Sequence, residues 1–190
     1  MSIMAVQVEV LFLLALLAMM TTISAKAKCP TVPVIADFST KLHRGTWYEI
    51  ERIDNPLQMT AKCISYTYCP KRNGDMRVSY GRLELAMLNR TTTRGTLTRI
   101  DRKYPNQFKL SLEAINDLDQ SVIYTDYKKH AVLYGCEGGI EFAFILSRER
   151  KPIGRRTLRR LYQYLRDLGT DVNQLITSDQ TGCDVCSRVC

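Results

Sequence analysis

Short alternating runs fill the sequence from Gly45 to Arg148, and they constrain the fold more than any other feature. In each run apolar, aromatic or β-branched residues alternate with polar ones, and turn residues separate the runs at intervals of roughly 8 to 14 positions. The runs read TWYEIERI, CISYTYC, MRVSYGRLEL, GTLTRIDR, QFKLSLEAI, SVIYTDYK, HAVLYGC and IEFAFILSR. None has helical periodicity over a useful length, and no Gly/Ser or Pro linker divides them. We predict an all-β fold, an eight-stranded antiparallel up-and-down β-barrel, because closure removes exposed strand edges.

Two polar segments between the runs carry signals of their own. The pair Asn73-Gly74 predicts a two-residue hairpin turn. Asn89-Arg90-Thr91 is the only N-x-S/T sequon, and it lies in the polar stretch NRTTTRG between two runs. A glycan on Asn89 would face solvent there.

The pattern changes after Arg148, where the sequence predicts one amphipathic helix in IGRRTLRRLYQYLRDLG. Apolar residues recur at steps of three and four, and Gly169 follows as a stop signal. They are Leu158, Leu161, Tyr162, Leu165 and Leu168. We expect this C-terminal helix to pack on the outside of the barrel, and the run DVNQLI at 171–176 to add an edge strand.

Basic residues crowd the first half of the predicted helix. They are Arg155, Arg156, Arg159 and Arg160, with Arg150 and Lys151 just upstream. The helix macrodipole disfavours cations at this end. The run is either a site for an anionic surface or an acidic receptor, or a solvated helix face.

The N-terminal segment predicts export. Residues 10–20 read VLFLLALLAMM, and the small-x-small sequence Ala25-Lys26-Ala27 follows as a cleavage pattern. The apolar run is shorter than the roughly 20 residues of a membrane span. We interpret residues 1–27 as a signal peptide that is removed, which leaves 28–190 as a single domain with a net charge of +8. Seven cysteines in an exported chain indicate disulfides, and the odd number leaves at least one without an intramolecular partner.

Three short motifs occur in a fixed order along this series: Gly45-x-Trp47 in the first run, Thr125-Asp126-Tyr127 after the sixth, and Arg148 after the eighth. With them occur Cys29-Pro30 at the start and TSDQTGC near the end. Over essentially the whole mature chain the sequence resembles the lipocalin family, most of all its apolipoprotein D and insect bilin-binding branch.

The resemblance implies structural roles for the motif residues. Trp47 would close the narrow end of the barrel under Arg148, with the Thr125-Asp126-Tyr127 loop nearby, and an arginine over an indole gains a cation–π contact. Disulfides Cys29–Cys136 and Cys63–Cys183 would follow the family pattern. Tyr68 and Phe144 fall where relatives have aromatic pocket residues.

Alternation extends the list of candidate ligand-binding residues. If Cys63 faces outward, then Ile64, Tyr66 and Tyr68 face the interior and Cys69 shares the outer face. Phe142 has the parity of Phe144. These aromatic residues either line a ligand cavity or fill the barrel themselves, since an eight-stranded barrel has room for one small ligand or for its own side chains.

Three cysteines depart from the family's usual four. Cys69 lies about 20 Å along the strand from Cys63, while three tail residues span roughly 10 Å and seven roughly 24 Å. We therefore predict a Cys69–Cys190 bridge with Cys186 left over, so that the protein is a monomer or a Cys186-linked dimer. The alternative, a zinc or redox motif at the C-terminus, is less favoured in an exported chain.

The sequence offers little for catalysis. It has two histidines, His43 and His130, and lacks HExxH, GxSxG and a phosphate loop. We expect both histidines at the surface, no metal or cofactor site, no enzymatic activity and no nucleic-acid partner. The leading hypothesis is a secreted carrier of a small hydrophobic ligand such as a bilin, retinoid, sterol or fatty acid, with haem also open. The alternative is a secreted interaction protein that acts through the basic helix or an unpaired cysteine.

Overall fold

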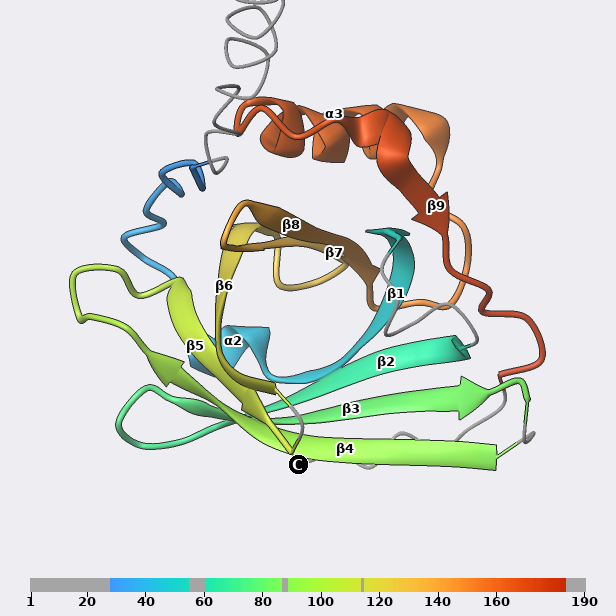
Figure 1. The fold of residues 1–190 in the computed structure, drawn as a ribbon, viewed down its shortest axis with the longest axis horizontal. Coiled ribbons are helices and arrows are strands. Elements are labelled where there is room, and N and C mark those ends of the chain that lie inside the picture. The colour runs from blue at the N-terminus through green and yellow to red at the C-terminus, as the bar shows by residue number, and fades with distance from the viewer. Residues whose placement is uncertain (1–27, 55–60, 87–88, 114, 184–190) are drawn as a thin grey trace, which may run out of the picture.

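One antiparallel β-sheet, closed into a barrel, makes up most of the protein (Figure 1). The computed structural model describes residues 28–54, 61–86, 89–113 and 115–183. Its barrel strands are β1 (Gly45–Ile53), β2 (Ala61–Pro70), β3 (Met76–Glu84), β4 (Asn89–Arg99), β5 (Gln107–Leu112), β6 (Ile115–Thr125), β7 (His130–Glu137) and β8 (Ile140–Ser147). Neighbours in sequence pair in space, and β1 pairs with both β2 and β8. The predicted eight-stranded barrel is confirmed, and the predicted signal peptide lies outside the described residues.

Alternation along the strands separates two hydrophobic cores. Side chains such as Trp47, Tyr68 and Leu133 fill the barrel interior. Side chains from the opposite strand faces, such as Val132 and Ile145, pack against helix α3 (Arg155–Arg166) on the outside. The apolar stripe of the predicted helix lies in this second core, and Figure 1 shows α3 lying outside the barrel.

Local details differ from the sequence predictions where strand pairing overrides local signals. The turn after β2 spans 71–75 rather than two residues, with Gly74 at φ +92°. The Thr-rich sequon stretch is not a loop: β4 begins at Asn89 and pairs with β3 there, because threonine suits a pleated strand. The predicted edge strand is shorter: a 3-10 turn at Val172–Gln174 precedes β9 (Leu175–Thr177), which pairs with β1. A short helix, α2 (Thr40–His43), was not predicted.

The closed end of the barrel is built from the motif residues. The Arg148 guanidinium carbon lies 3.7 Å from the Trp47 ring centroid. Its Nη1 donates to the carbonyl of Thr46 (2.9 Å), and its Nη2 donates to the carbonyls of Arg44 (2.8 Å) and Tyr127 (3.2 Å). The arginine therefore ties β8, β1 and the β6–β7 turn together over the indole.

The β6–β7 turn is held in shape by its own side chains. The Asp126 carboxylate accepts hydrogen bonds from three successive backbone N–H groups, those of Lys128, Lys129 and His130. The Thr125 hydroxyl accepts from the Tyr127 N–H. This geometry presents the Tyr127 carbonyl to Arg148.

Replacing Arg148 by alanine is expected to lower the free energy of unfolding by about 2–3 kcal/mol, because a cation–π contact and several charge-assisted hydrogen bonds are lost from a half-buried site. Arg148→Lys keeps the charge but loses the planar guanidinium, so its free energy of unfolding should lie between those of the parent protein and the alanine variant. Urea unfolding followed by the fluorescence of Trp47 measures this. An alanine variant within about 0.5 kcal/mol of the parent protein would contradict a fastening role for Arg148.

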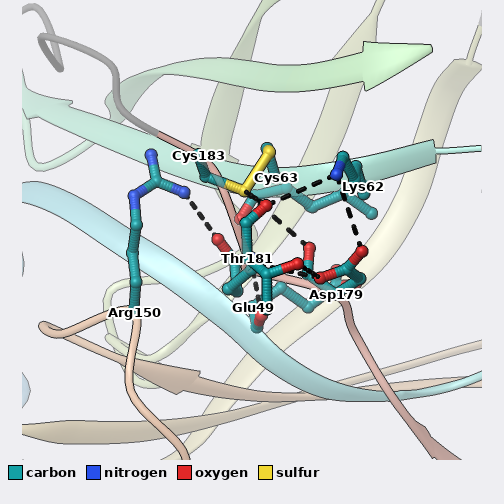
Figure 2. The surroundings of a disulfide bond; sticks show 9 residues. Glu49, Lys62, Cys63, Arg150, Asp179, Thr181 and Cys183 are labelled. Carbon is teal, nitrogen blue, oxygen red and sulfur yellow. Dashed lines mark hydrogen bonds and ion pairs between the residues drawn. A yellow bond between two sulfur atoms is a disulfide. The ribbon is translucent and has the colours of Figure 1, made fainter. Parts of the chain in front are cut away.

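A C-terminal strap, residues 175–183, fills the gap where β1 and β2 diverge. The Ser178 N–H donates to the Ile50 carbonyl of β1, and the Cys63 N–H of β2 donates to the Asp179 carbonyl. The Gln180 amide donates to the carbonyls of Glu49 (2.9 Å) and Ile64 (2.8 Å), and so bridges both strands. The Cys63–Cys183 disulfide anchors the end of the strap (Figure 2).

The disulfide Cys29–Cys136 attaches the N-terminal segment to β7. Asn106 adds to this attachment, because its side chain accepts from the Ile35 N–H and donates to the Pro33 carbonyl. Both disulfides join the cysteines that the family resemblance implied. Cys69 is also disulfide-bonded. Its predicted partner, Cys190, lies outside the described residues.

Candidate functional site: the barrel interior

An aromatic layer crosses the middle of the barrel. The rings of Tyr66 and Tyr68 are stacked with centroids 6.3 Å apart, and Tyr66 also contacts Tyr80 (5.4 Å) and Phe144 (5.9 Å). The three tyrosines are buried and Phe144 is half-buried. The structure thus brings three of the four candidate ligand-binding residues together. Phe142 is half-buried on β8, and among the described residues it has no ring contact with this layer.

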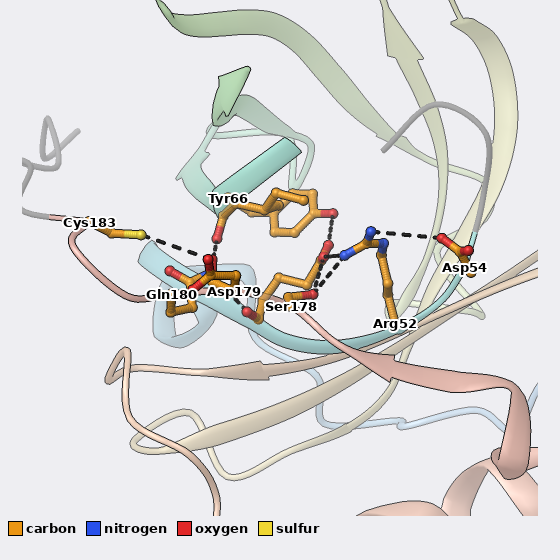
Figure 3. Close-up of polar contacts among 9 residues, drawn as sticks. Arg52, Asp54, Tyr66, Ser178, Asp179, Gln180 and Cys183 are labelled. Carbon is orange, nitrogen blue, oxygen red and sulfur yellow. Dashed lines mark hydrogen bonds and ion pairs between the residues drawn. The ribbon is translucent and has the colours of Figure 1, made fainter. Parts of the chain in front are cut away.

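A buried polar cluster that no sequence pattern predicted lies beside this layer (Figure 3). The Glu49 side chain has no exposed surface, and its carboxylate accepts from the Tyr66 hydroxyl (2.7 Å) and the Ser178 hydroxyl (2.6 Å). Arg52 Nη1 lies 3.4 Å from Glu49 Oε1 and donates to Ser178 Oγ at 3.0 Å. Burial, followed by the neighbouring Glu49, holds the pKa of Tyr66 well above its ordinary value. The tyrosine therefore stays a neutral donor to the carboxylate.

A β-bulge explains why Glu49 and Arg52 meet. Residues three apart on a regular strand point to opposite faces. Between Glu49 and Glu51 the register of β1 against β8 shifts, so Glu51 faces outward and accepts from Tyr162 of α3 at 2.7 Å. The shift turns Arg52 inward, opposite Phe144. Alternation alone would have placed Glu51 inside and Arg52 outside.

His43, the last residue of α2, lies at the floor of the barrel and not at the surface, so that prediction was wrong. Its imidazole is fully buried and stacks on Trp47, with centroids 5.0 Å apart, and it also contacts Tyr68 and Phe38. The short helix folds the chain back under the barrel, which carries His43 inside. Burial, followed by the charge of Arg148, lowers the pKa of His43 from 6.5 to about 3. The second histidine, His130, is half-buried and lies 3.6 Å from Asp126.

Folding stability should depend on pH through His43. The folded protein keeps this imidazole neutral down to about pH 3. The unfolded chain takes up a proton below pH 6.5, so stability is fully present above that pH and falls as the pH drops. Between pH 7 and 5 the parent protein should lose about 2 kcal/mol more than His43→Gln, in which this group does not titrate. Urea midpoints of both proteins at several pH values measure the difference, and parallel curves would show that His43 is not buried neutral.

A cavity of about 10 Å³ lies at the floor, which is room for one water molecule. Its polar lining consists of His43, Tyr68 and Gln120. The apolar lining consists of Met76, Leu97, Phe108, Val122 and Leu133.

The opposite end of the interior is more open. Four apolar residues packed on the interior core are half-buried rather than buried: Ala61, Leu110, Leu112 and Phe144. Arg82 and Glu84 continue the inward parity of β3 toward this end and form an ion pair. Asn89, the sequon residue, is exposed and pairs with Glu84.

Comparison with known proteins agrees with this architecture. A family model described as a lipocalin-like domain matches residues 39–180. The chain belongs to the lipocalin-like family. This lipocalin is 27% identical to mouse (Mus musculus) apolipoprotein D over 91% of its own length and 95% of that protein, and 30% identical to insecticyanin-A of Manduca sexta over 57% and 59%. The family and branch resemblance predicted from the motifs is confirmed.

Solved structures place the fold in the same group. Lobster apocrustacyanin A1 matches with a TM-score of 0.69 and 19% identity, covering 83% of this chain and 91% of that one. Insecticyanin from the tobacco hornworm matches with a TM-score of 0.68 and 22% identity, covering 82% and 88%. At these identities the match shows the fold alone.

Two further observations concern the described residues only. None of their helices is long and apolar enough to cross a membrane. They contain no group of three or more His, Cys, Asp or Glu side chains placed to hold a metal ion.

Proposed function

We propose that this lipocalin is a secreted carrier that binds a small hydrophobic ligand at the open half of its barrel. The observation that carries the proposal is the half-buried apolar wall of Ala61, Leu110, Leu112 and Phe144, which continues inward into the buried aromatic layer. Apolar surface left partly exposed inside a barrel gains free energy when a ligand covers it, at about 25 cal/mol per Å² before the costs of binding. The family to which the chain belongs supports binding rather than catalysis.

The filled floor restricts where such a ligand lies. At the floor, Trp47, Tyr68 and the side chains around them are packed around a cavity the size of one water, so most of the ligand would lie above the aromatic layer. Phe144 and Tyr66 would then form its lower surface. Bilin, retinoid, sterol, fatty acid and haem are the candidates to be compared.

Displacement of a fluorescent fatty acid by these candidates tests the proposal, together with native mass spectrometry of the secreted protein before and after solvent extraction. Phe144→Ala should weaken binding about tenfold or more, because it removes an aromatic wall of the site. Tyr164→Ala, which removes an exposed ring on α3, is the matched control and should bind normally. A protein that carries no adduct and displaces the probe with none of the candidates would contradict the carrier function.

Export supports the same function. Disulfides such as Cys63–Cys183 form and persist in oxidising compartments. Residues 1–27 would direct export, and a glycan on the exposed Asn89 would lie beside the open end of the barrel, because this residue begins β4 opposite Glu84. A Cys186-linked dimer is a separate possibility for the secreted form, visible by non-reducing mass analysis.

A second candidate function is binding of a polyanion through α3. Arg155, Arg156, Arg159 and Arg160 are all exposed, and the helix contains no acidic residue. Among the described ion pairs, none involves these arginines. Alanine at all four positions should lower the salt concentration that elutes the protein from heparin. The charge-matched control replaces four exposed lysines by alanine: Lys41, Lys103, Lys128 and Lys129. If both variants elute at the same lower salt concentration, net charge and not the helix surface explains heparin binding.

A further inference from the structure

His43 is a buried polar group that the proposed ligand wall does not use. It has no exposed surface, and neither ring nitrogen has a hydrogen-bond partner among the described residues. A neutral imidazole carries one N–H donor and one acceptor nitrogen, and polar groups buried in proteins are nearly always paired. The rings around it, Trp47, Tyr68 and Phe38, offer their faces and edges rather than a strong partner. The Trp47 N–H is itself occupied, because it donates to the His43 carbonyl at 2.9 Å.

The floor cavity lies where such a partner would fit. His43 lines it, and two other residues of the lining, Gln120 and Tyr68, have polar side-chain ends. Its volume of about 10 Å³ matches one water-sized group. Gln120 is itself buried at 8% exposure, and its side chain lines this space from the β6 wall and hydrogen-bonds with the Tyr68 side chain.

We propose that this cavity is a polar subsite for one neutral hydroxyl group, which belongs either to an internal water molecule or to the terminal hydroxyl of a carried lipid. A hydroxyl both donates and accepts, and so can satisfy the imidazole and the Gln120 amide together. A lipid hydroxyl in this cavity rests on the carrier function proposed above, and it can enter only if the side chains of the aromatic layer move apart. An internal water molecule depends on neither condition.

The surroundings select a neutral group. A carboxylate or phosphate would have to leave water for a space with neutral donors and an otherwise apolar lining. A cation would lie close to Arg148, whose guanidinium lies over the Trp47 ring and reaches the His43 carbonyl at 3.5 Å. The lowered pKa of His43 agrees with a site that holds no charge.

The first experiment tests the subsite without any lipid. The chain has two histidines, so His130→Gln leaves His43 as the only source of imidazole signals. Nitrogen-15 NMR of that variant should show one ring nitrogen donating and the other accepting a hydrogen bond, with magnetisation transfer from a bound water. If neither ring nitrogen of His43 is hydrogen-bonded in the unliganded protein, no internal water molecule occupies the subsite.

The second experiment compares 1-hexadecanol with its methyl ether, which accepts but cannot donate a hydrogen bond, by displacement of a fluorescent fatty acid. If the lipid hydroxyl reaches the subsite, the alcohol should bind about tenfold more tightly or better, and both His43→Phe and Gln120→Leu should abolish the preference. Gln120→Leu leaves the stack on Trp47 in place, which separates loss of the subsite from a misfolded floor.

The outcomes distinguish the two sources from failure. Bound water without an alcohol preference assigns the site to water, and a preference lost in both variants assigns it to the lipid. Neither bound water nor a preference overturns the subsite. If neither of these two lipids binds, the lipid source is removed and the wider comparison of ligands above decides the carrier function, while the NMR result decides whether the subsite exists.

Discussion

Replacing Glu49 by alanine is expected to destabilise the protein by about 3–5 kcal/mol, because the buried Arg52 guanidinium loses its buried carboxylate partner and keeps the exposed Asp54 carboxylate at 3.8 Å. The Arg52 side chain is 6% exposed and that of Glu49 is fully buried. The same change removes the acceptor of two short hydrogen bonds, those from Tyr66 and Ser178. Ser178 belongs to the C-terminal strap, so loss of its hydrogen bond to Glu49 should also loosen the strap in the gap between β1 and β2. Urea unfolding gives the free energy.

A double substitution makes this prediction specific. Replacing Glu49 and Arg52 together by methionine removes both charges, and such replacements of buried pairs are often neutral or stabilising. We therefore expect the double variant to recover most of the stability that Glu49→Ala loses. Glu49→Gln, which keeps an acceptor without the charge, should lie between the two. A double variant as unstable as Glu49→Ala would show that cavity formation, and not the buried charge, sets the cost.

Removing the Cys63–Cys183 disulfide by replacing both cysteines with alanine is expected to cost about 2–5 kcal/mol, because the bond restrains a long loop of the unfolded chain. The two cysteines are 120 residues apart in sequence. Chemical denaturation followed by Trp47 fluorescence measures the loss. Replacing both residues rather than one avoids a free thiol, which can exchange with other disulfides such as that of Cys69.

The other disulfide supplies a matched control. Cys29 and Cys136 are 107 residues apart, so their removal should cost nearly the same free energy. Only the Cys63–Cys183 variant should release the strap, since Cys183 ends it. Hydrogen exchange at the Ser178 amide, which bonds to the Ile50 carbonyl, should accelerate in that variant alone. Equal exchange in both variants would show that strand pairing, and not the disulfide, holds the strap.

The sequence predicted only some of the residues that face the barrel interior. Alternation correctly placed Tyr66 and Tyr68 inside, and Phe144 lies beside them, because these residues occupy regular stretches of β2 and β8. Alternation would not have placed Arg52 inside, since a bulge is a property of the pairing between two strands and leaves no mark in the sequence of one of them. The same holds for Ser178, whose role depends on a contact with Glu49 129 residues away in sequence.

Function depends on the same distinction. The sequence predicted a β-barrel and left open whether its interior holds a ligand cavity or is filled by its own side chains. The packed floor and the half-buried wall near Phe144 answer that in part: the lower barrel holds a space for one water, and the apolar surface that a ligand could cover lies above it. Volume inside a barrel depends on rotamers and strand register together, which no local pattern encodes.

The sequence by itself determined the strands and the helix, because period-two and period-3.6 patterns are local properties of the chain. The pairing of Trp47 with Arg148 was implied by the family resemblance that the ordered motifs carry. Tertiary structure alone decided that His43 is buried under Trp47, that Glu49 and Arg52 share the interior, and that residues 175–183 seal the barrel. Each of these depends on segments distant in sequence that meet only when the sheet closes. A fully buried polar group depends on such meetings for its partners, and the amino-acid order around it does not reveal them.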